Sequence, residues 1–128
     1  MLLRVLVVDD SARMRVTIID VLRTVAACNV VGEGANGLEA LELARTLQPD
    51  AVVLDVNMPV MGGIEALRVL RSEFPCIQVV MVSSILEQEV RDHALQLGAA
   101  ACLEKGPELL NGLPAIVTEL ATQCPAKT

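Results

Sequence analysis

Short apolar runs alternate along the chain with longer stretches that have helical periodicity. The apolar runs carry few polar positions, which is typical of strands buried on both faces of a parallel sheet. The predicted strands are residues 4–8, 29–32, 51–54, 77–82 and 100–103. Each run is followed by a stretch long enough for a helix, so the pattern predicts five strand–helix units.

The stretches between the strands place apolar residues three or four positions apart, as one face of a helix requires. These residues are Met14, Ile18, Val21, Leu22 and Val25 in residues 11–25, then Ala40, Leu43, Ala44 and Leu47, then Ile64, Leu67 and Leu70, then Leu86, Val90, Ala94 and Leu97. Asn36 with Glu39 three positions later predicts an N-cap. Gly98 is a candidate C-cap residue. Pro114 suits a first helical position, so we expect the last helix to begin near Leu113.

Alternating strands and helices predict an α/β fold, a doubly wound (βα)₅ sandwich with helices on both faces of a parallel sheet. The length of 128 residues suits one domain. We expect the domain to occupy residues 1–122 and residues 123–128 to form a flexible tail.

Composition narrows the functional classes. The chain is 53% hydrophobic and 20% charged, which excludes disorder, and its net charge of −6 without a basic stripe argues against nucleic-acid binding. The apolar segment at the start is short and is followed directly by Asp9 and Asp10, so we expect neither a signal peptide nor a membrane span. We therefore expect a cytoplasmic protein. Four cysteines without metal-ligand spacing are interpreted as free thiols: Cys28, Cys76, Cys102 and Cys124.

Polar residues that could bind ligands or take part in catalysis follow the ends of the predicted strands. Asp9 and Asp10 follow the first strand, Asp55 the third, Ser83 the fourth and Lys105 the fifth. The carboxyl ends of parallel strands meet at one edge of the sheet, where ligands bind at the point at which the strand order reverses. If the first and third strands are neighbours, the three carboxylates converge there.

Three neighbouring carboxylates repel each other, and a divalent cation would offset that repulsion. Oxygen ligands without nearby Cys or His favour a hard ion, Mg²⁺ or Mn²⁺. Mg²⁺ commonly uses one or two carboxylates, so another carboxylate stays available as a nucleophile. Lys105 and Ser83 could then bind the oxygens of a transferred phosphoryl group.

This set of residues resembles the receiver domain of two-component response regulators. The resemblance covers residues 3–120 and rests on Asp9-Asp10, Asp55, Asn57-Met58-Pro59, Gly63, Ser83 and Lys105. It implies a CheY-like, flavodoxin-like fold with strand order 2-1-3-4-5. It also implies a signalling switch rather than an enzyme.

The resemblance assigns the metal and phosphorylation roles. Asp55 resembles the phosphoacceptor. Asp10 resembles the direct Mg²⁺ ligand, Asp9 acts largely through water, and Asn57 contributes its backbone carbonyl. The implied phosphoryl donor is a phosphohistidine on a sensor histidine kinase or a histidine phosphotransfer protein.

The resemblance also assigns the switch. Ser83 resembles the hydroxyl that turns toward the phosphoryl group, and Lys105 resembles the lysine that pairs with it. The implied effector binds the face made by the fourth helix, fifth strand and last helix. The stretch Met81-Val82-Ser83-Ser84 is similar to receivers of chemotaxis methylesterases, which implies chemotaxis-type signalling.

Two positions depart from the receiver pattern. Receivers usually have an aromatic residue three positions before the lysine, and this chain has Cys102, which is too small to gate a surface in the same manner. Gly106 separates Lys105 from Pro107, so a cis peptide at 105–106 would lack the proline that favours it.

Simpler interpretations exist for the single residues. Asp9 and Asp10 could cap the first helix, Asp55 and Ser83 could be ordinary turn residues, and His93 is expected to face solvent. Cys102 could also be a redox sensor.

The sequence alone leaves three other functional classes open. A haloacid-dehalogenase-type phosphatase would need a second Asp where Asn57 stands. An FMN-binding flavodoxin would need a phosphate-binding first loop where Asp9 and Asp10 stand. A receiver-shaped scaffold would bind partners without being phosphorylated.

Overall fold

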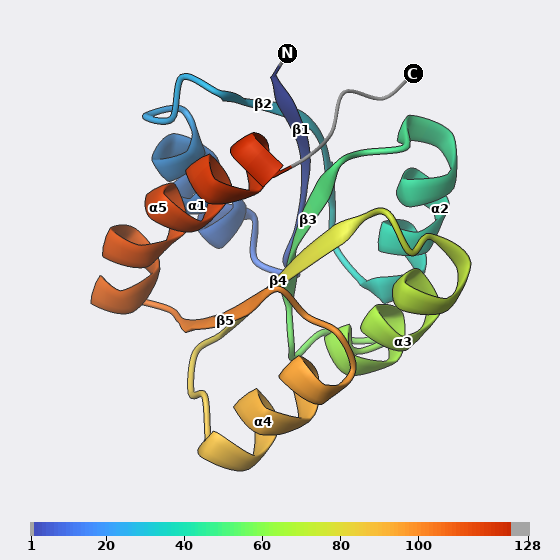
Figure 1. The fold of residues 1–128 in the computed structure, drawn as a ribbon. Helices are drawn as coiled ribbons and strands as arrows, with labels where there is room; N and C mark the ends of the chain where they lie inside the picture. Colours follow the sequence, from blue (N-terminus) through green and yellow to red (C-terminus); the bar gives the residue numbers. More distant parts are fainter. Residues whose placement is uncertain (1, 124–128) are drawn as a thin grey trace.

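A parallel sheet with strand order β2-β1-β3-β4-β5 forms the centre of the molecule, which confirms the predicted fold and strand order (Figure 1). The computed structural model describes residues 2–123. The strands are β1 (Leu3–Val8), β2 (Cys28–Gly34), β3 (Ala51–Asp55), β4 (Gln78–Ser83) and β5 (Ala101–Glu104). Asp55 and Ser83 are therefore the last residues of their strands rather than the first residues after them.

Five helices cover the two faces of the sheet (Figure 1). They are α1 (Ala12–Leu22), α2 (Gly37–Leu47), α3 (Gly63–Glu73), α4 (Gln88–Gln96) and α5 (Pro107–Gln123). Helices α1 and α5 lie on one face, and α2, α3 and α4 lie on the other. Gln123, predicted to begin a tail, is the last residue of α5, and the rest of that predicted tail, residues 124–128, lies outside the described residues.

The core has two layers because β1, β3 and β4 are buried on both faces. One layer packs Leu6, Leu54 and Met81 against α2, α3 and α4. The other packs Val7 and Val53 against α1 and α5. Neighbouring strand residues therefore enter opposite layers, as the pleat of a strand requires.

The start of α2 uses the cap that the sequence predicts, whereas α1 uses a different one. The Asn36 side chain accepts a hydrogen bond from the Glu39 backbone N–H at 2.9 Å, which confirms the predicted N-cap. Glu39 accepts from the Ala35 N–H at 3.0 Å, one residue before the N-cap, so the arrangement is a variant of the capping box. Ser11 caps α1 by accepting from the Met14 N–H. The alternative in which Asp9 or Asp10 is the N-cap of this helix is therefore wrong.

The expected start of the last helix is also wrong. Helix α5 begins at Pro107, so Pro114 lies inside it rather than at its first position. Pro107 takes the favourable first position instead, because that N–H needs no helical partner. Leu109, Leu113 and Val117 repeat at intervals of four and are buried, and this packing outweighs the hydrogen bond lost at Pro114.

Backbone contacts at the carboxyl edge of the sheet hold the candidate residues in place. The Lys105 N–H donates to the Ser83 carbonyl at 2.8 Å, so Lys105 stays beside the end of β4. Gly63 lies so close to the end of β3 that a Cβ there would clash with the Asp55 carbonyl oxygen. Only glycine lets α3 begin at this distance from Asp55.

Two further expectations concern the peptide bond after Lys105 and membrane-spanning segments. All peptide bonds in residues 2–123 are trans, including the one between Lys105 and Gly106, and Gly106 has a φ of 115°. Among these residues, no helix combines the length and apolar character needed to cross a membrane.

Candidate functional site

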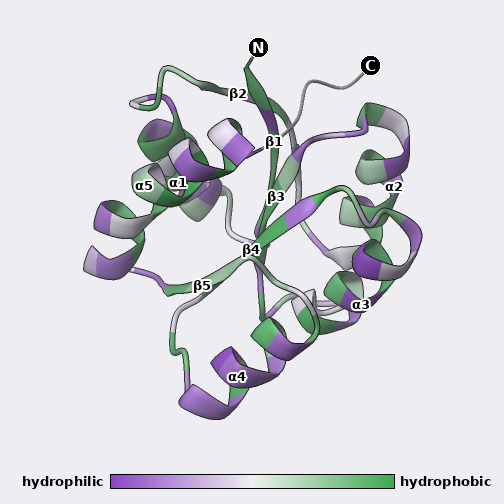
Figure 2. Cartoon of the chain, in the orientation of Figure 1, coloured by the Kyte–Doolittle hydropathy of each residue, from purple (hydrophilic) through white to green (hydrophobic). Residues whose placement is uncertain are grey.

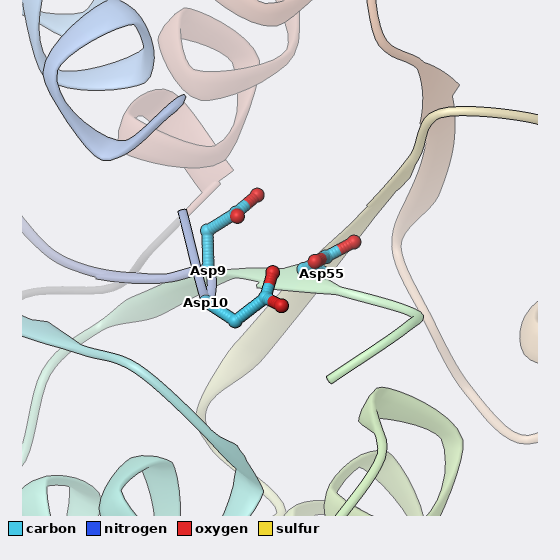
Figure 3. Close-up of side chains that lie close together, drawn as sticks. All are labelled: Asp9, Asp10 and Asp55. Carbon is cyan, nitrogen blue, oxygen red and sulfur yellow. The ribbon is translucent and has the colours of Figure 1, made fainter. Parts of the chain in front are cut away.

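Three carboxylates meet at the carboxyl edge of the sheet. Asp9 and Asp10 follow β1, Asp55 ends the adjacent strand β3, and each offers an oxygen within 4.8 Å of the other two (Figure 3). Asp9 and Asp55 are buried, whereas Asp10 is exposed. The reversal of strand order between β1 and β3 creates this meeting, as the sequence pattern predicted.

Lys105 supplies the positive charge nearest to two of these carboxylates. Its Nζ lies 2.8 Å from Asp9 Oδ2 and 3.4 Å from Asp55 Oδ1. The Asp9 side chain has no exposed surface and that of Lys105 is 16% exposed, so solvent screens this pair weakly. One lysine facing three carboxylates leaves the cluster with net negative charge.

The pKa of Asp55 reflects both its burial and the charges around it. Burial, together with the negative charge of Asp9, raises the pKa of Asp55 to about 6, although Lys105 and the Asn57 N–H act in the opposite direction. For Lys105, burial alone would lower the pKa, but the hydrogen bonds and charges of Asp9 and Asp55 outweigh it and raise the pKa. Lys105 therefore stays charged at neutral pH.

Ser83 and Asn57, the other two predicted site residues, differ in burial. The Ser83 side chain is buried, and its hydroxyl donates to the Ile85 carbonyl at 2.9 Å, in the loop between β4 and α4. Asn57 is exposed and its backbone N–H donates to Asp55 Oδ1 at 3.4 Å. Asn57 also lines, with Asp10, an open depression beside the cluster.

The donor set suits a small hard cation. All three grouped side chains offer carboxylate oxygens, and their mutual distances allow one ion to contact more than one of them. Burial first and the charge of Asp9 second raise the pKa of Asp55, so a cation beside it would favour its charged form. Asp9 is less available than Asp10 because it already pairs with Lys105 and accepts from the Ser11 N–H.

The remaining residues singled out from the sequence lie elsewhere. His93 is exposed on α4, with Nε2 3.2 Å from Arg68 Nη2. Cys102 is buried in β5, and Cys28, Cys76 and Cys102 are free thiols. Cys124 lies outside the described residues.

Sequence reasoning missed one residue at the site. Arg15, on α1, donates from Nη1 to the Asp9 carbonyl at 2.7 Å. Arg15 lies four residues after Ser11, one helical turn into α1. Its partner depends on the helix rotation and on the rotamer of a long side chain, so the sequence carries no clear signal for this contact.

Comparison with known proteins gives consistent matches. The family model described as response regulator receiver domain matches residues 5–114. The receiver-containing "response regulator domain of Thermotoga maritima CheB" superposes with a TM-score of 0.83 and 35% identity, covering 97% of this chain and 96% of that one.

Sequence relatives are longer than this chain. A protein-glutamate methylesterase/protein-glutamine glutaminase from Myxococcus xanthus is 43% identical over 83% of this chain, which spans 31% of that relative. The response regulator GacA of Pseudomonas viridiflava is 41% identical over 95% of this chain, which spans 57% of that relative. The matched part is thus only a portion of each of these proteins.

Proposed function

The chain belongs to the family of response regulator receiver domains, and from that premise we propose that it accepts a phosphoryl group on Asp55 and switches partner binding in response. The observation that carries this proposal is the meeting of Asp9, Asp10 and Asp55 within 4.8 Å, with Lys105 paired to two of them. A buried nucleophile beside a fixed cation and a cation-binding cluster suits phosphoryl transfer.

In the proposed reaction, an Asp55 carboxylate oxygen attacks the phosphorus of a phosphohistidine in line. A P–O bond forms as the P–N bond breaks, and the departing imidazole takes up a proton. Lys105, held 3.4 Å from Asp55 Oδ1, stabilises the negative charge of the phosphoryl oxygens. The donor would be a sensor histidine kinase or a histidine phosphotransfer protein.

The metal in this proposal is Mg²⁺. Asp10, Asp55 and the Asn57 backbone carbonyl would hold it, with Asp9 acting largely through water. When bound, the ion neutralises charge on the cluster and on the phosphoryl oxygens. The chain's own contribution is to keep these oxygens together and to leave one Asp55 oxygen free to attack.

The acyl phosphate adds a charge of about −1.5 to −2 to an already acidic site. In the proposal, Ser83 then exchanges its hydrogen bond with the Ile85 carbonyl for one with the phosphoryl group. The loop between β4 and α4 moves, and the face formed by α4, β5 and α5 presents a different surface to an effector. The domain acts as a cytoplasmic switch rather than as an enzyme.

We assign the switch to chemotaxis-type signalling. The support is the 43% identity to a methylesterase/glutaminase and the fold match to a CheB receiver. An FMN-binding role finds no support in this family membership.

The test is phosphorylation with a small donor. The wild-type chain, Asp55→Asn and Asp20→Asn are mixed with Mg²⁺ and acetyl phosphate and weighed intact by mass spectrometry. Asp20 is the matched control because it is an exposed aspartate on α1, paired only with Arg23 in the described part of the chain. We expect one phosphoryl adduct on wild type and Asp20→Asn, none on Asp55→Asn, and none when EDTA removes the metal.

The other outcomes separate the rival classes. No adduct from acetyl phosphate or from a histidine kinase would favour a scaffold. Donor turnover that persists in Asp55→Asn would favour a phosphatase that uses another nucleophile.

A further inference from the structure

Arg15 connects the ends of two strands to helix α1. Its Nη1 donates to the Asp9 carbonyl at 2.7 Å, and its Nε donates to Glu33 Oε1 at 3.0 Å. The Arg15 side chain is 19% exposed and that of Glu33 50%. Glu33 thus holds a largely covered guanidinium in a fixed orientation on the Asp9 carbonyl.

This carbonyl lies where the chain leaves the sheet. The ladders of β1 end at Val8, which is the last residue in register with both β2 and β3, and the Asp9 N–H still donates to the Gly34 carbonyl. The Asp9 carbonyl therefore needs a partner outside the sheet, and Arg15 provides one.

The orientation of this carbonyl determines where Asp10 points. The Asp9 C=O and the Asp10 N–H share one planar peptide unit, so fixing the carbonyl fixes the start of the Asp10 residue. Within residues 2–123, the Asp10 carboxylate has no hydrogen bond or ion pair of its own, in contrast to Asp9 and Asp55. The position of the Asp10 carboxylate beside Asp9 and Asp55 therefore depends on the backbone conformation at Asp10.

We propose that Arg15 is a positioning residue for the acidic cluster: by holding the Asp9 carbonyl, it sets the Asp10 carboxylate beside Asp9 and Asp55 for cation binding. This proposal rests on the proposed function, since it assumes that the cluster binds Mg²⁺. It extends that function by assigning a role to a residue that touches neither the metal nor the phosphoryl group.

Charge alone predicts the opposite effect of removing Arg15. A guanidinium near a divalent-cation site repels the ion, so its loss should tighten binding if Coulomb forces decide. If Arg15 acts by positioning the Asp10 carboxylate, its loss weakens Mg²⁺ binding even though a repelling positive charge is removed. The two explanations therefore differ in sign.

The experiment measures Mg²⁺ affinity by isothermal titration calorimetry for wild type, Arg15→Ala, Arg15→Lys and the control Arg13→Ala. Arg13 is an exposed arginine on the same helix, and within residues 2–123 its side chain has no hydrogen bond or ion pair. We expect about tenfold weaker binding in Arg15→Ala, in the range of outer-shell substitutions around metal ligands. Arg13→Ala should bind as wild type or slightly tighter.

Arg15→Lys separates geometry from charge, because lysine keeps the charge but lacks the fork that reaches Glu33 and Asp9 together. We expect its affinity to fall severalfold. In the metal-free protein, NMR should show a changed ¹³C shift of the Asp9 carbonyl in both Arg15 variants but not in Arg13→Ala. Circular dichroism verifies that each variant is folded, and Arg15→Lys carries the test if Arg15→Ala is not.

Unchanged or tighter Mg²⁺ binding in both Arg15 variants would overturn this proposal and leave the proposed function intact. A wild-type chain that binds no Mg²⁺ would overturn the metal site itself, and this proposal with it.

Discussion

Val60 adopts a backbone conformation that costs free energy in the folded chain. Its φ of 69° lies in the left-handed region, which β-branched residues rarely adopt. The side chain is 78% exposed, so burial does not offset the strain. Val60 belongs to the loop between β3 and α3 that lines the depression beside Asp10, and strain of this kind is often found at functional loops.

We expect Val60→Asn to raise the free energy of unfolding by about 1 kcal/mol, because asparagine tolerates the left-handed region. Urea unfolding followed by circular dichroism measures this, since the chain has no Trp or Tyr. The control is Val16→Asn, an exposed valine in α1 where the backbone is helical, and its stability should change little. Equal stability of Val60→Asn and wild type would show that the loop carries no strain.

Cys102 does not have the environment of a reactive thiol. It is buried in β5, and burial raises its pKa, with Arg91 lowering it and Glu108 raising it further. A buried thiol with a raised pKa remains protonated at neutral pH and is a poor nucleophile, which argues against a redox sensor. Cys102 packs as a small apolar residue where receivers usually have an aromatic one.

Helix α4 depends on polar contacts more than the other helices do. Much of α4 is hydrophilic (Figure 2). Ala94 is the only buried residue of this helix. Arg91 connects it to the next two elements, donating to the Cys102 carbonyl at 2.7 Å and to Glu108 Oε1 at 2.9 Å. This arginine joins α4, β5 and α5, the face proposed to change on phosphorylation.

The ion pair between Arg91 and Glu108 predicts a pH effect. The hydrogen bond from Arg91 lowers the pKa of Glu108, so the pair stabilises the fold above the unfolded pKa and this contribution is lost as pH falls through the folded pKa. Both side chains are partly exposed, so Glu108→Gln should cost only about 0.5 kcal/mol at pH 7. The difference from wild type should vanish in acid.

Urea unfolding at several pH values measures this difference, with Glu89→Gln as the control. Glu89 is an exposed residue of α4 without an ion pair among residues 2–123. A loss in Glu108→Gln that stays constant down to low pH would mean that the carboxylate charge is not the cause.

The elements were largely predictable from the sequence, because strands buried on both faces and amphipathic helices leave clear periodicities. The start of α5 was not. Gly112 and Pro114 are both poor helix formers, yet Leu109 and Leu113 bury their side chains against the sheet. Local helix propensity favoured a helix that starts near Leu113, but burial of Leu109 and Leu113 extends the helix back to Pro107.

At the scale of the whole molecule, the fold and the acidic cluster were predictable for the same reason. Parallel strands bring their carboxyl ends to one edge, so Asp9, Asp10, Asp55 and Lys105 meet whatever the helices do. The contacts of Arg15 and Arg91 were not predictable, because a long side chain reaches its partner only for a particular helix rotation and rotamer. The sequence therefore predicts the residues of the cluster, whereas the arginines that contact the strand ends and helices are identified only from the structure.

The acidic cluster also sets how the stability of the whole fold depends on pH. Asp55 has a folded pKa raised from 3.8 to about 6, first by burial and then by the charge of Asp9. Between these values the folded chain binds more protons than the unfolded chain, so this group makes stability fall as pH rises. Above about pH 6 the full cost of the charged carboxylate is present.

We therefore expect Asp55→Asn to be more stable than wild type by about 1–2 kcal/mol above pH 6, and the difference to shrink toward pH 4. Thermal or urea unfolding across this range measures it, and Asp20→Asn should follow wild type because Asp20 is exposed on α1. Mg²⁺ should stabilise wild type more than Asp55→Asn, because a ligand of the folded state adds stability by mass action. A stability difference that is the same at pH 4 and pH 7 would contradict a raised pKa of Asp55. It would mean that burial destabilises the charged Asp55 carboxylate less than the structure indicates.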